Sequence, residues 1–337
     1  MRKLLTKLAV ALVALPLAVG AAEGLIYALD PHGISDGFNG NQYREELLEL
    51  VLDTPRIYRH LPAKSAALRG FDVSTDSRGC RGPARDGAKA EATKRMLFLG
   101  DSVVFGWGVS DEDTFVALVE PELRAKTDAA WETVNLGHMM YDTTQELAAL
   151  EEVGFLYEPD VVVLVFVDND IVLTRGILEG QARDPLEDPN VSEDAKRILR
   201  MSTRLAKLGR YLPYTAALLQ YHYIQSHPVS QTGSTEHAVE LGLDVEAGWE
   251  ACRQALTRIR ALCEERGVPF FVLDYYTQDM LREFCAESGI PYGSIAFTDE
   301  ETATGIRNSD SDAHANENGH RILTGHIVRE LERLRAF

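Results

Sequence analysis

The chain has 337 residues, of which 45% are hydrophobic, and a formal net charge of −18. A chain of this length and apolar content can bury one large core, either alone or with appended segments. Its negative charge argues against a nucleic acid or an anionic lipid surface as a partner, because a polyanion would be repelled.

The N-terminus has the pattern of an exported protein. Three basic residues precede an apolar run, Leu8–Ala22, which resumes after Glu23 and continues to Leu29. Such a pattern is a secretory signal or an uncleaved anchor, and about 20 apolar residues can span a bilayer. The positive-inside rule places everything after residue 30 outside the cytoplasm. We expect residues 1–30 to be a membrane anchor, although small residues before Glu23 permit cleavage.

The middle of the chain divides into a leading segment and a regular core. Residues 31–95 combine a helix-like stretch at 42–52 with a linker rich in glycine and charge. From residue 96 onward, apolar runs alternate with helical patterns. Strands are expected at 95–100, 131–137, 159–170 and 268–276, and helices at 114–126, 143–156, 246–266, 277–288 and 319–335. This alternation predicts an α/β domain over 96–337, with a parallel sheet between two layers of helices.

The alternation breaks over an insertion at about 171–247. Four tyrosines lie among apolar residues at 210–228, and the polar stretch 229–237 follows them. We expect a pair of helices packed on the edge of the sheet. The alternative is a lid that shapes substrate choice.

The four cysteines, Cys80, Cys252, Cys263 and Cys285, have no tight metal-ligand spacing. Cys252 and Cys263 lie on one predicted helix, where a rise of 1.5 Å per residue separates their Cα atoms by ~16 Å. That distance exceeds the reach of a disulfide. We expect buried free thiols, and any disulfide would involve Cys80 or Cys285. The sequence indicates neither a metal nor a cofactor.

Polar residues follow three predicted strands at their carboxyl ends. They are the triplet Gly-Asp-Ser at 100–102, the stretch 135–146 and the triplet Asp-Asn-Asp at 168–170. Parallel strands end at the same edge of a sheet, so these turns can converge there. The stretch 309–320, just before the last predicted helix, adds aspartates and a histidine.

These stretches contain the groups that acyl transfer requires. A hydroxyl nucleophile needs a base, and the base needs a partner that fixes its tautomer. Ser102, His314 and Asp312 can fill these roles. The oxyanion needs donors, which the backbone N–H of Ser102, a backbone N–H of 135–146 and the Asn169 amide can provide. Alone, Ser102 would be read as a helix cap, whereas Asp101 is expected to bond to nearby backbone.

The sequence resembles the SGNH hydrolase family, also called GDSL esterases and lipases, over residues 75–335. The resemblance rests on the blocks at 100–102, 135–146, 167–170 and 312–320 in this order. The stretch 77–82 is similar to the corresponding part of membrane-anchored bacterial members. The resemblance implies a flavodoxin-like three-layer sandwich with a central parallel sheet, the SGNH hydrolase fold.

The resemblance also implies hydrolysis of an acyl ester through an acyl-serine. Ser102 would be the nucleophile, His314 the base and Asp312 its orienting partner. The N–H groups of Ser102 and Met140 and the side chain of Asn169 would hold the oxyanion.

Three positions depart from the family pattern. Met140 replaces a glycine and would be costly if the backbone there needs a positive φ, whereas the nearby Gly137 is expected to serve the turn. Val167 replaces another glycine. Ser311 stands where the usual aspartate precedes the histidine, and Asp312 lies one position closer, a spacing also found in anchored and glycan-acting relatives.

Other polar and aromatic residues have ordinary explanations. His138 is expected to be a solvated loop residue, with substrate contact as the alternative. Arg81 is expected in a surface ion pair, with an anionic substrate group as the alternative. Trp107 suits the core or a pocket wall. His320 and His326 are spaced so that they cannot share a metal ion with His314, because six helical residues turn the side chain by about 120°.

The sequence therefore predicts an exported serine esterase that acts on a small-molecule or glycan acyl ester. An O-acyl group, such as acetyl, on an extracytoplasmic glycan or lipid is the expected target. An acyltransferase with the same triad and a non-catalytic ligand-binding domain are the alternatives.

Overall fold

The computed structural model describes residues 2–85, 88–173, 186–189, 191–226, 239 and 243–337. Its central sheet consists of β5 (Thr93–Gly100), β6 (Ala130–Gly137), β7 (Val161–Phe166), β8 (Phe270–Asp274) and β9 (Tyr292–Ser294). The strands lie in the order β6-β5-β7-β8-β9, and every neighbouring pair is parallel. Numbered along the chain this is 2-1-3-4-5, the flavodoxin-like order.

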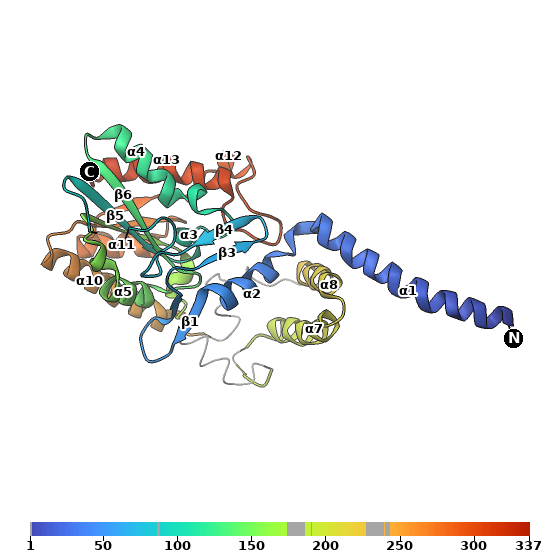
Figure 1. Cartoon of the computed structure of the whole chain (residues 1–337). Helices are drawn as coiled ribbons and strands as arrows, with labels where there is room; N and C mark the ends of the chain where they lie inside the picture. The colour runs from blue at the N-terminus through green and yellow to red at the C-terminus, as the bar shows by residue number, and fades with distance from the viewer. Residues whose placement is uncertain (1, 86–87, 174–185, 190, 227–238, 240–242) are drawn as a thin grey trace.

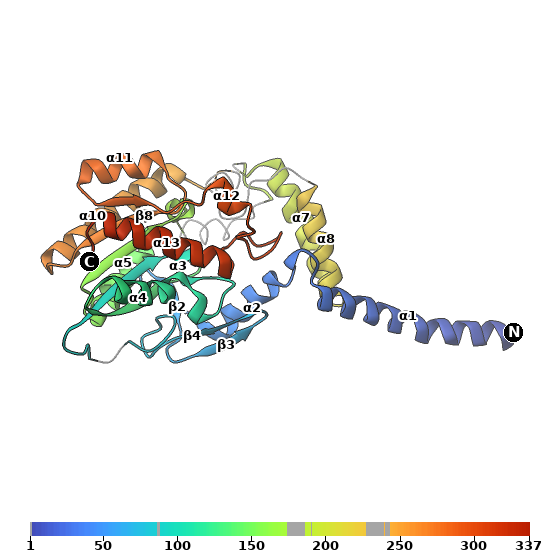
Figure 2. The same ribbon diagram turned by 90° about the horizontal axis from the view of Figure 1, so that it is seen from above.

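Helices cover both faces of this sheet (Figures 1 and 2). One face packs on α4 (Phe115–Lys126) and α13 (Glu317–Arg333). The other packs on α5 (Thr143–Glu152), α10 (Val245–Glu265) and α11 (Asp279–Ser288). The predicted three-layer α/β architecture is confirmed.

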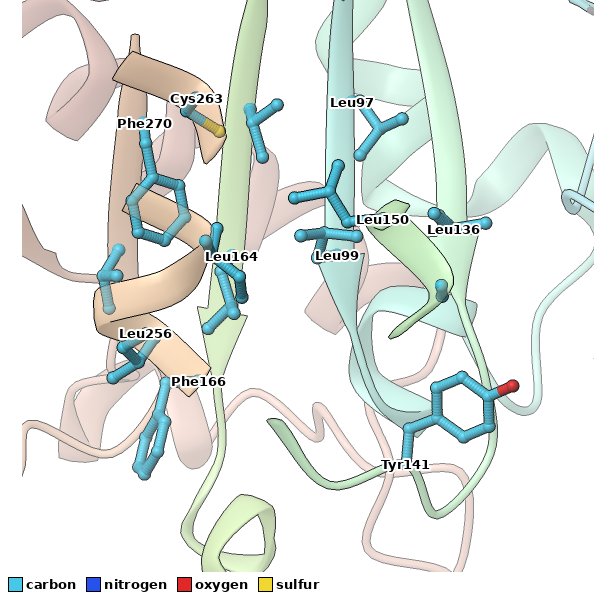
Figure 3. Packing of buried hydrophobic residues seen from close by; sticks show 14 of the residues in the cluster. Leu97, Leu99, Leu136, Tyr141, Leu150, Leu164, Phe166, Leu256, Cys263 and Phe270 are labelled. Atoms are coloured by element: carbon cyan, nitrogen blue, oxygen red, sulfur yellow. The ribbon is translucent and has the colours of Figure 1, made fainter. Parts of the chain in front are cut away.

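Strand β5 shows why the apolar runs of the sequence are nearly continuous. Leu97 and Leu99 belong to the core on the α5 and α10 side, and Figure 3 shows them beside Leu150 of α5. Met96 and Phe98 belong to the core on the α4 and α13 side. All four side chains are fully buried. A strand covered on both faces needs apolar residues at every position.

The remaining elements precede the sheet or connect its strands. The N-terminal part contains α1 (Arg2–Leu29), η1 (Pro31–Gly33), α2 (Asp36–Leu47), β1 (Leu48–Val51), β2 (Ile57–His60), β3 (Ser65–Leu68) and β4 (Phe71–Ser74). The short helices are α3 (Ser102–Phe105), η2 (Asp111–Asp113), η3 (Gly154–Tyr157), η4 (Asp168–Ile171) and α12 (Asp299–Thr302). The insertion contains α7 (Glu193–Gly209) and α8 (Pro213–Gln225).

The helix expected at 42–52 is wrong in its second half. Helix α2 ends at Leu47, and the next four residues form strand β1, which pairs with β2 in an antiparallel hairpin. Backbone pairing with β2 outweighs the helical preference of this leucine-rich stretch, which illustrates how tertiary context overrides local propensity.

The segment between α1 and the sheet packs on the turn that follows β5. Tyr43 and Leu47 of α2 share a core with Leu68, Phe71 and other residues of β3 and β4. Phe105 and Trp107, which follow Ser102 in the chain, complete this core. Residues 36–74 thus form a layer against α3.

Helix α1 extends away from the sheet domain (Figure 1). Its stretch Val10–Leu29 has a mean hydropathy of 1.9 and is not buried within the chain. This length and composition suit a helix that crosses a membrane, and signal anchors and signal sequences share them.

The two helices of the insertion lie beside the junction of α1 and α2, not on the edge of the sheet as expected (Figures 1 and 2). The carboxylate of Glu23 in α1 accepts hydrogen bonds from the backbone N–H groups of Tyr214 and Thr215, at 3.0 and 2.9 Å. A carboxylate at a helix N-terminus satisfies free N–H groups and the helix dipole, which draws α8 toward α1. The polar stretch 229–237 lies outside the described residues.

The cysteine prediction is confirmed, because Cys80, Cys252, Cys263 and Cys285 are all buried and free. Burial raises the pKa of the Cys80 and Cys252 thiols above the ordinary value. These thiols therefore behave as small apolar side chains rather than as nucleophiles.

Leu164→Ala should lower the free energy of unfolding by about 2–5 kcal/mol, because it empties a fully buried position on strand β7. Leu52→Ala is the control, since that side chain is 63% exposed and its loss should change the value by less than about 0.5 kcal/mol. Urea unfolding followed by circular dichroism measures both. Equal losses would contradict the placement of the core.

Candidate active site

Ser102 opens the first helical turn after β5. Asp101 caps this turn: its carboxylate accepts the N–H of Val103 at 2.8 Å, and its second oxygen lies 3.2 Å from the hydroxyl oxygen of Ser102. Because the chain leaves β5 toward β6 on one side and returns to β7 on the other, Ser102 stands where the strand order reverses. Ligands of open α/β sheets bind at this point.

The structure brings Ser102, His314 and Asp312 into one hydrogen-bonded chain. His314 Nε2 lies 2.8 Å from Ser102 Oγ, and His314 Nδ1 lies 2.6 Å from Asp312 Oδ1. The same carboxylate oxygen accepts the backbone N–H of His314 at 3.0 Å. The imidazole is therefore oriented from both sides.

The hydrogen bonds between His314 and Asp312 shift the pKa of both groups. Burial alone would lower the pKa of His314, but the hydrogen bond and negative charge of Asp312 outweigh it and raise that pKa. Burial alone would raise the pKa of Asp312, but its hydrogen bonds with His314 and Asn308 bring that pKa below the ordinary value. Asp312 is thus held as a carboxylate at neutral pH.

Asn308 is a supporting residue that the sequence analysis missed. Its side-chain amide donates to Asp312 Oδ2 at 2.9 Å and to the carbonyl of Trp107 at 3.1 Å. It thereby ties the loop of Asp312 and His314 to the turn that follows Ser102. An asparagine in a polar loop has no sequence signal that distinguishes this role.

Ser311 takes no part in the hydrogen-bonded chain. Its N–H donates to the carbonyl of His32 at 3.0 Å, and its hydroxyl donates to the carbonyl of Gly33 at 2.7 Å. The position that usually carries the aspartate thus contacts η1, and Asp312 supplies the carboxylate instead.

Asp36 of α2 is a second residue that the sequence analysis missed. Its carboxylate accepts the indole N–H of Trp107 at 2.6 Å. Burial, followed by the negative charge of Asp312, raises the pKa of Asp36 to about 6. A carboxyl group from the N-terminal segment therefore interacts electrostatically with Asp312 and His314.

Met140 has the backbone conformation that would favour a glycine. Its φ is +60°, and its side chain is 44% exposed. A left-handed residue other than glycine costs about 1–2 kcal/mol. The loop holds this conformation because the N–H of His138 donates to the carbonyl of Gly100, and the carbonyl of Met139 accepts the hydroxyl of Tyr58.

Gly137 does more than serve the turn. A Cβ atom at this position would lie 2.2 Å from the backbone nitrogen of Phe105. Its N–H donates to the side chain of Asn135, whose amide donates to the carbonyl of Val104 at 2.8 Å. The absence of a side chain lets the end of β6 approach α3 closely.

Asn169 lies in η4, immediately after β7. Its side chain hydrogen-bonds to the carboxylate of Asp101 and thereby counteracts the rise that burial causes in the pKa of that group. Its amide oxygen is buried and has no hydrogen-bond partner. Gly248 of α10 lets this turn pack closely, since a Cβ there would lie 1.8 Å from the carbonyl oxygen of Ile171.

His138 is not the solvated residue that was expected. It is 1% exposed and stacks between His60 and Tyr141, at centroid distances of 4.0 and 4.3 Å. Its Nε2 lies 2.9 Å from the guanidinium of Arg56. Burial lowers its pKa, so the ring is neutral and serves packing.

Arg81 is neither in a surface pair nor available to a substrate. It is 3% exposed, pairs with Asp111 at 2.8 Å, and donates to the carbonyls of Phe105, Gly106 and Val109. The guanidinium thus satisfies the carbonyls at the end of α3 and braces the turn that begins with Ser102.

His320, His326 and Trp107 are packed inside the fold, and for Trp107 this agrees with the expected place in the core or a pocket wall. His320 Nδ1 accepts the N–H of Phe115 at 3.0 Å, and His326 Nε2 lies 2.8 Å from Glu301. Both histidines are buried, and Trp107 is 2% exposed. Within the described residues, no group of three or more His, Cys, Asp or Glu side chains is arranged to hold a metal ion.

No family model and no curated protein matches the chain. Among solved structures, the chain is similar to TesA, with 12% identity over 72% of this chain and 99% of that one and a TM-score of 0.42. It is also similar to the psychrotrophic esterase EstA from Pseudoalteromonas sp. (10% identity, 72% and 100% coverage, TM-score 0.43). A third is a catalytic mutant of the acetylxylan esterase Axe2 from Geobacillus stearothermophilus (14% identity, 72% and 96% coverage, TM-score 0.40).

Asp36→Asn should stabilise the fold at neutral pH by roughly 3 kcal/mol. Because the pKa is about 6 in the fold against an ordinary 3.8, the folded state keeps a proton that the unfolded state releases between these values. Asp36 therefore destabilises the fold as pH rises from 4 to 6. Urea unfolding at pH 4, 5, 6 and 7 should show that the difference between variant and parent is absent at pH 4 and complete at pH 7. A difference that is the same at every pH would contradict this assignment.

Proposed function

We propose that this protein is an exported serine esterase of the SGNH hydrolase family, with Ser102, His314 and Asp312 as its catalytic triad. The observation that carries the proposal is the hydrogen-bonded chain from Ser102 Oγ through both ring nitrogens of His314 to Asp312. Its position at the reversal point of a 2-1-3-4-5 parallel sheet, where ligands bind in such folds, supports it.

In the proposed mechanism, His314 Nε2 accepts the hydroxyl proton of Ser102 as Oγ attacks the carbonyl carbon of the ester. Asp312 holds the Nδ1 proton and stabilises the imidazolium. The tetrahedral intermediate collapses to an acyl-serine, and the alcohol leaves with the proton from His314. His314 then takes a proton from water as the water oxygen attacks the acyl-serine, and it returns this proton to Ser102 Oγ as the bond between Oγ and the acyl carbon breaks and the acid leaves.

We assign the oxyanion to three donors: the N–H groups of Ser102 and Met140 and the side-chain amide of Asn169. Donors directed at the developing charge commonly contribute 10²–10³ in rate, to order of magnitude. Asp101 and Gly137 are supporting residues. Asp101 bonds to the turn of Ser102 and to Asn169, and Gly137 permits close packing on α3.

We further propose that α1 anchors the enzyme in the membrane and that the sheet domain lies outside the cytoplasm. The basic N-terminus and the apolar stretch Val10–Leu29 support this orientation. The substrate is then an acyl ester of an extracytoplasmic glycan or lipid.

A fluorophosphonate probe should label the full chain at Ser102 and nowhere else, because only a serine activated by a neighbouring base attacks phosphorus readily. The modified peptide is identified by mass spectrometry. Ser102→Ala should abolish labelling, whereas Ser226→Ala, at an exposed position after α8, should not. Folded protein that remains unlabelled would favour a non-catalytic ligand-binding domain.

The rate should depend on pH through His314, which must be neutral to accept a proton. Because Asp312 raises its pKa, kcat/KM for p-nitrophenyl acetate should rise with pH through a midpoint above the ordinary 6.5. Asp312→Asn should move the midpoint to lower pH and lower kcat by roughly 10³–10⁴. A midpoint unchanged by this substitution would exclude His314 as the base.

A further inference from the structure

A cavity of about 480 Å³ lies between α2, the β1–β2 hairpin, Trp107 and the loop after β6. Its wall includes Tyr43, Leu48, Tyr58, Trp107, Met139 and Met140. This volume is typical of a small-molecule site. Helix α2 and the hairpin, which belong to the N-terminal segment, supply most of the wall.

The polar atoms of the three aromatic wall residues are each hydrogen-bonded within the protein. The hydroxyl of Tyr43 is bonded to His60 at 2.7 Å, that of Tyr58 donates to the Met139 carbonyl at 2.5 Å, and the indole N–H of Trp107 donates to Asp36. A sugar would need hydrogen-bond partners in place of water. The ring faces of Tyr43, Tyr58 and Trp107 present apolar surface to the cavity, and apolar surface suits a hydrocarbon.

The charged groups at the rim are also paired. Glu49 lies 2.7 Å from Arg59, and Arg44 donates to the side chain of Asn41. Each of these two charged side chains at the rim therefore has a hydrogen-bond partner and is held by contacts within the protein.

Two residues of the wall connect the cavity to the proposed catalytic groups. The N–H of Trp107 donates to the carbonyl of Ser102 at 3.2 Å, and its carbonyl accepts the amide of Asn308, which holds Asp312. Met140 supplies a proposed oxyanion donor and also lines the cavity. The cavity and the proposed catalytic groups therefore share two neighbouring residues, Trp107 and Met140.

The strained backbone of Met140 fits this arrangement. A glycine would adopt its φ of +60° without strain, but it would leave the cavity without a wall at the oxyanion loop. Methionine has a flexible apolar side chain that adapts to an irregular hydrocarbon surface. The side chain therefore has a use at this position that offsets its conformational cost.

We propose that this cavity binds the acyl chain of the substrate, so that the enzyme prefers esters of medium-length fatty acids to acetyl esters. The inference rests on the proposed esterase function and specifies its substrate. An acetyl group has a single methyl and would leave the cavity unfilled, whereas each methylene buried from water contributes roughly fourfold in affinity.

The first test is the chain-length dependence of the full chain in lipid nanodiscs. For p-nitrophenyl acetate, butyrate, hexanoate and octanoate, kcat/KM should rise with each step, by at least tenfold from acetate to octanoate. A profile that is flat or that falls after acetate would overturn the inference.

Gly40 offers a variant that fills the cavity. It lies in α2 and lines the cavity, and a Cβ atom there would meet nothing within 4 Å. Gly40→Leu should lower the octanoate-to-acetate ratio of kcat/KM at least tenfold. Gly37→Leu is the matched control, because Gly37 lies in the same helix with the same free space but is not part of the wall. An unchanged ratio in Gly40→Leu would contradict the assignment.

A binding measurement separates this inference from the esterase proposal. In the Ser102→Ala background, which cannot form an acyl-serine, isothermal titration with 2-decanone measures occupation of the cavity without turnover. Gly40→Leu should weaken binding at least tenfold, and Gly37→Leu should not. Cavity-dependent binding by a chain that fails to react with fluorophosphonate would overturn only the esterase. Labelling of Ser102 without such binding would overturn only the acyl cavity.

Discussion

The parallel sheet covered by helices on both faces is the constraint on which the rest of the structure depends. Its two faces are closed by α4 and α13 and by α5, α10 and α11. Polar groups can therefore gather only at an edge. The carboxyl ends of β5, β6 and β7 bring Ser102, the loop of Met140 and the turn of Asn169 to one edge. The reversal of strand order there leaves space for a ligand between the strands' ends.

The N-terminal segment completes what the sheet alone does not. The carbonyls of His32 and Gly33 accept hydrogen bonds from Ser311, next to Asp312. Asp36 accepts a hydrogen bond from Trp107, in the turn after Ser102. It also contributes most of the apolar cavity. Because this segment directly follows the apolar helix α1, the proposed anchor, triad and acyl cavity form one connected part of the molecule.

The position of a residue could be predicted where it depends on the immediate neighbours in the sequence. Ser102 and Asn169 follow strongly apolar strands, and His314 and Asp312 precede a periodic helix, so their common location follows from the topology. The sequence analysis also stated that methionine at position 140 would be costly if the backbone there had a positive φ, and the φ of Met140 is positive. The predictions were wrong for residues whose surroundings depend on burial by other segments. His138 and Arg81 are polar residues in loops, yet both are almost fully buried, and distant segments cover them.

By itself, the sequence determined four strands of the central sheet, the helices that cover it and the order in which the strand ends carry polar groups, because periodicity and turn residues are local properties. Only the tertiary structure decided which carboxylates lie near the triad, which loop residues are buried and where a cavity remains. Asp36 and Trp107 are 71 residues apart in the chain, and Asn308 and Trp107 are 201 apart. Such contacts arise when separate apolar surfaces pack together, and no periodicity in either segment specifies its partner.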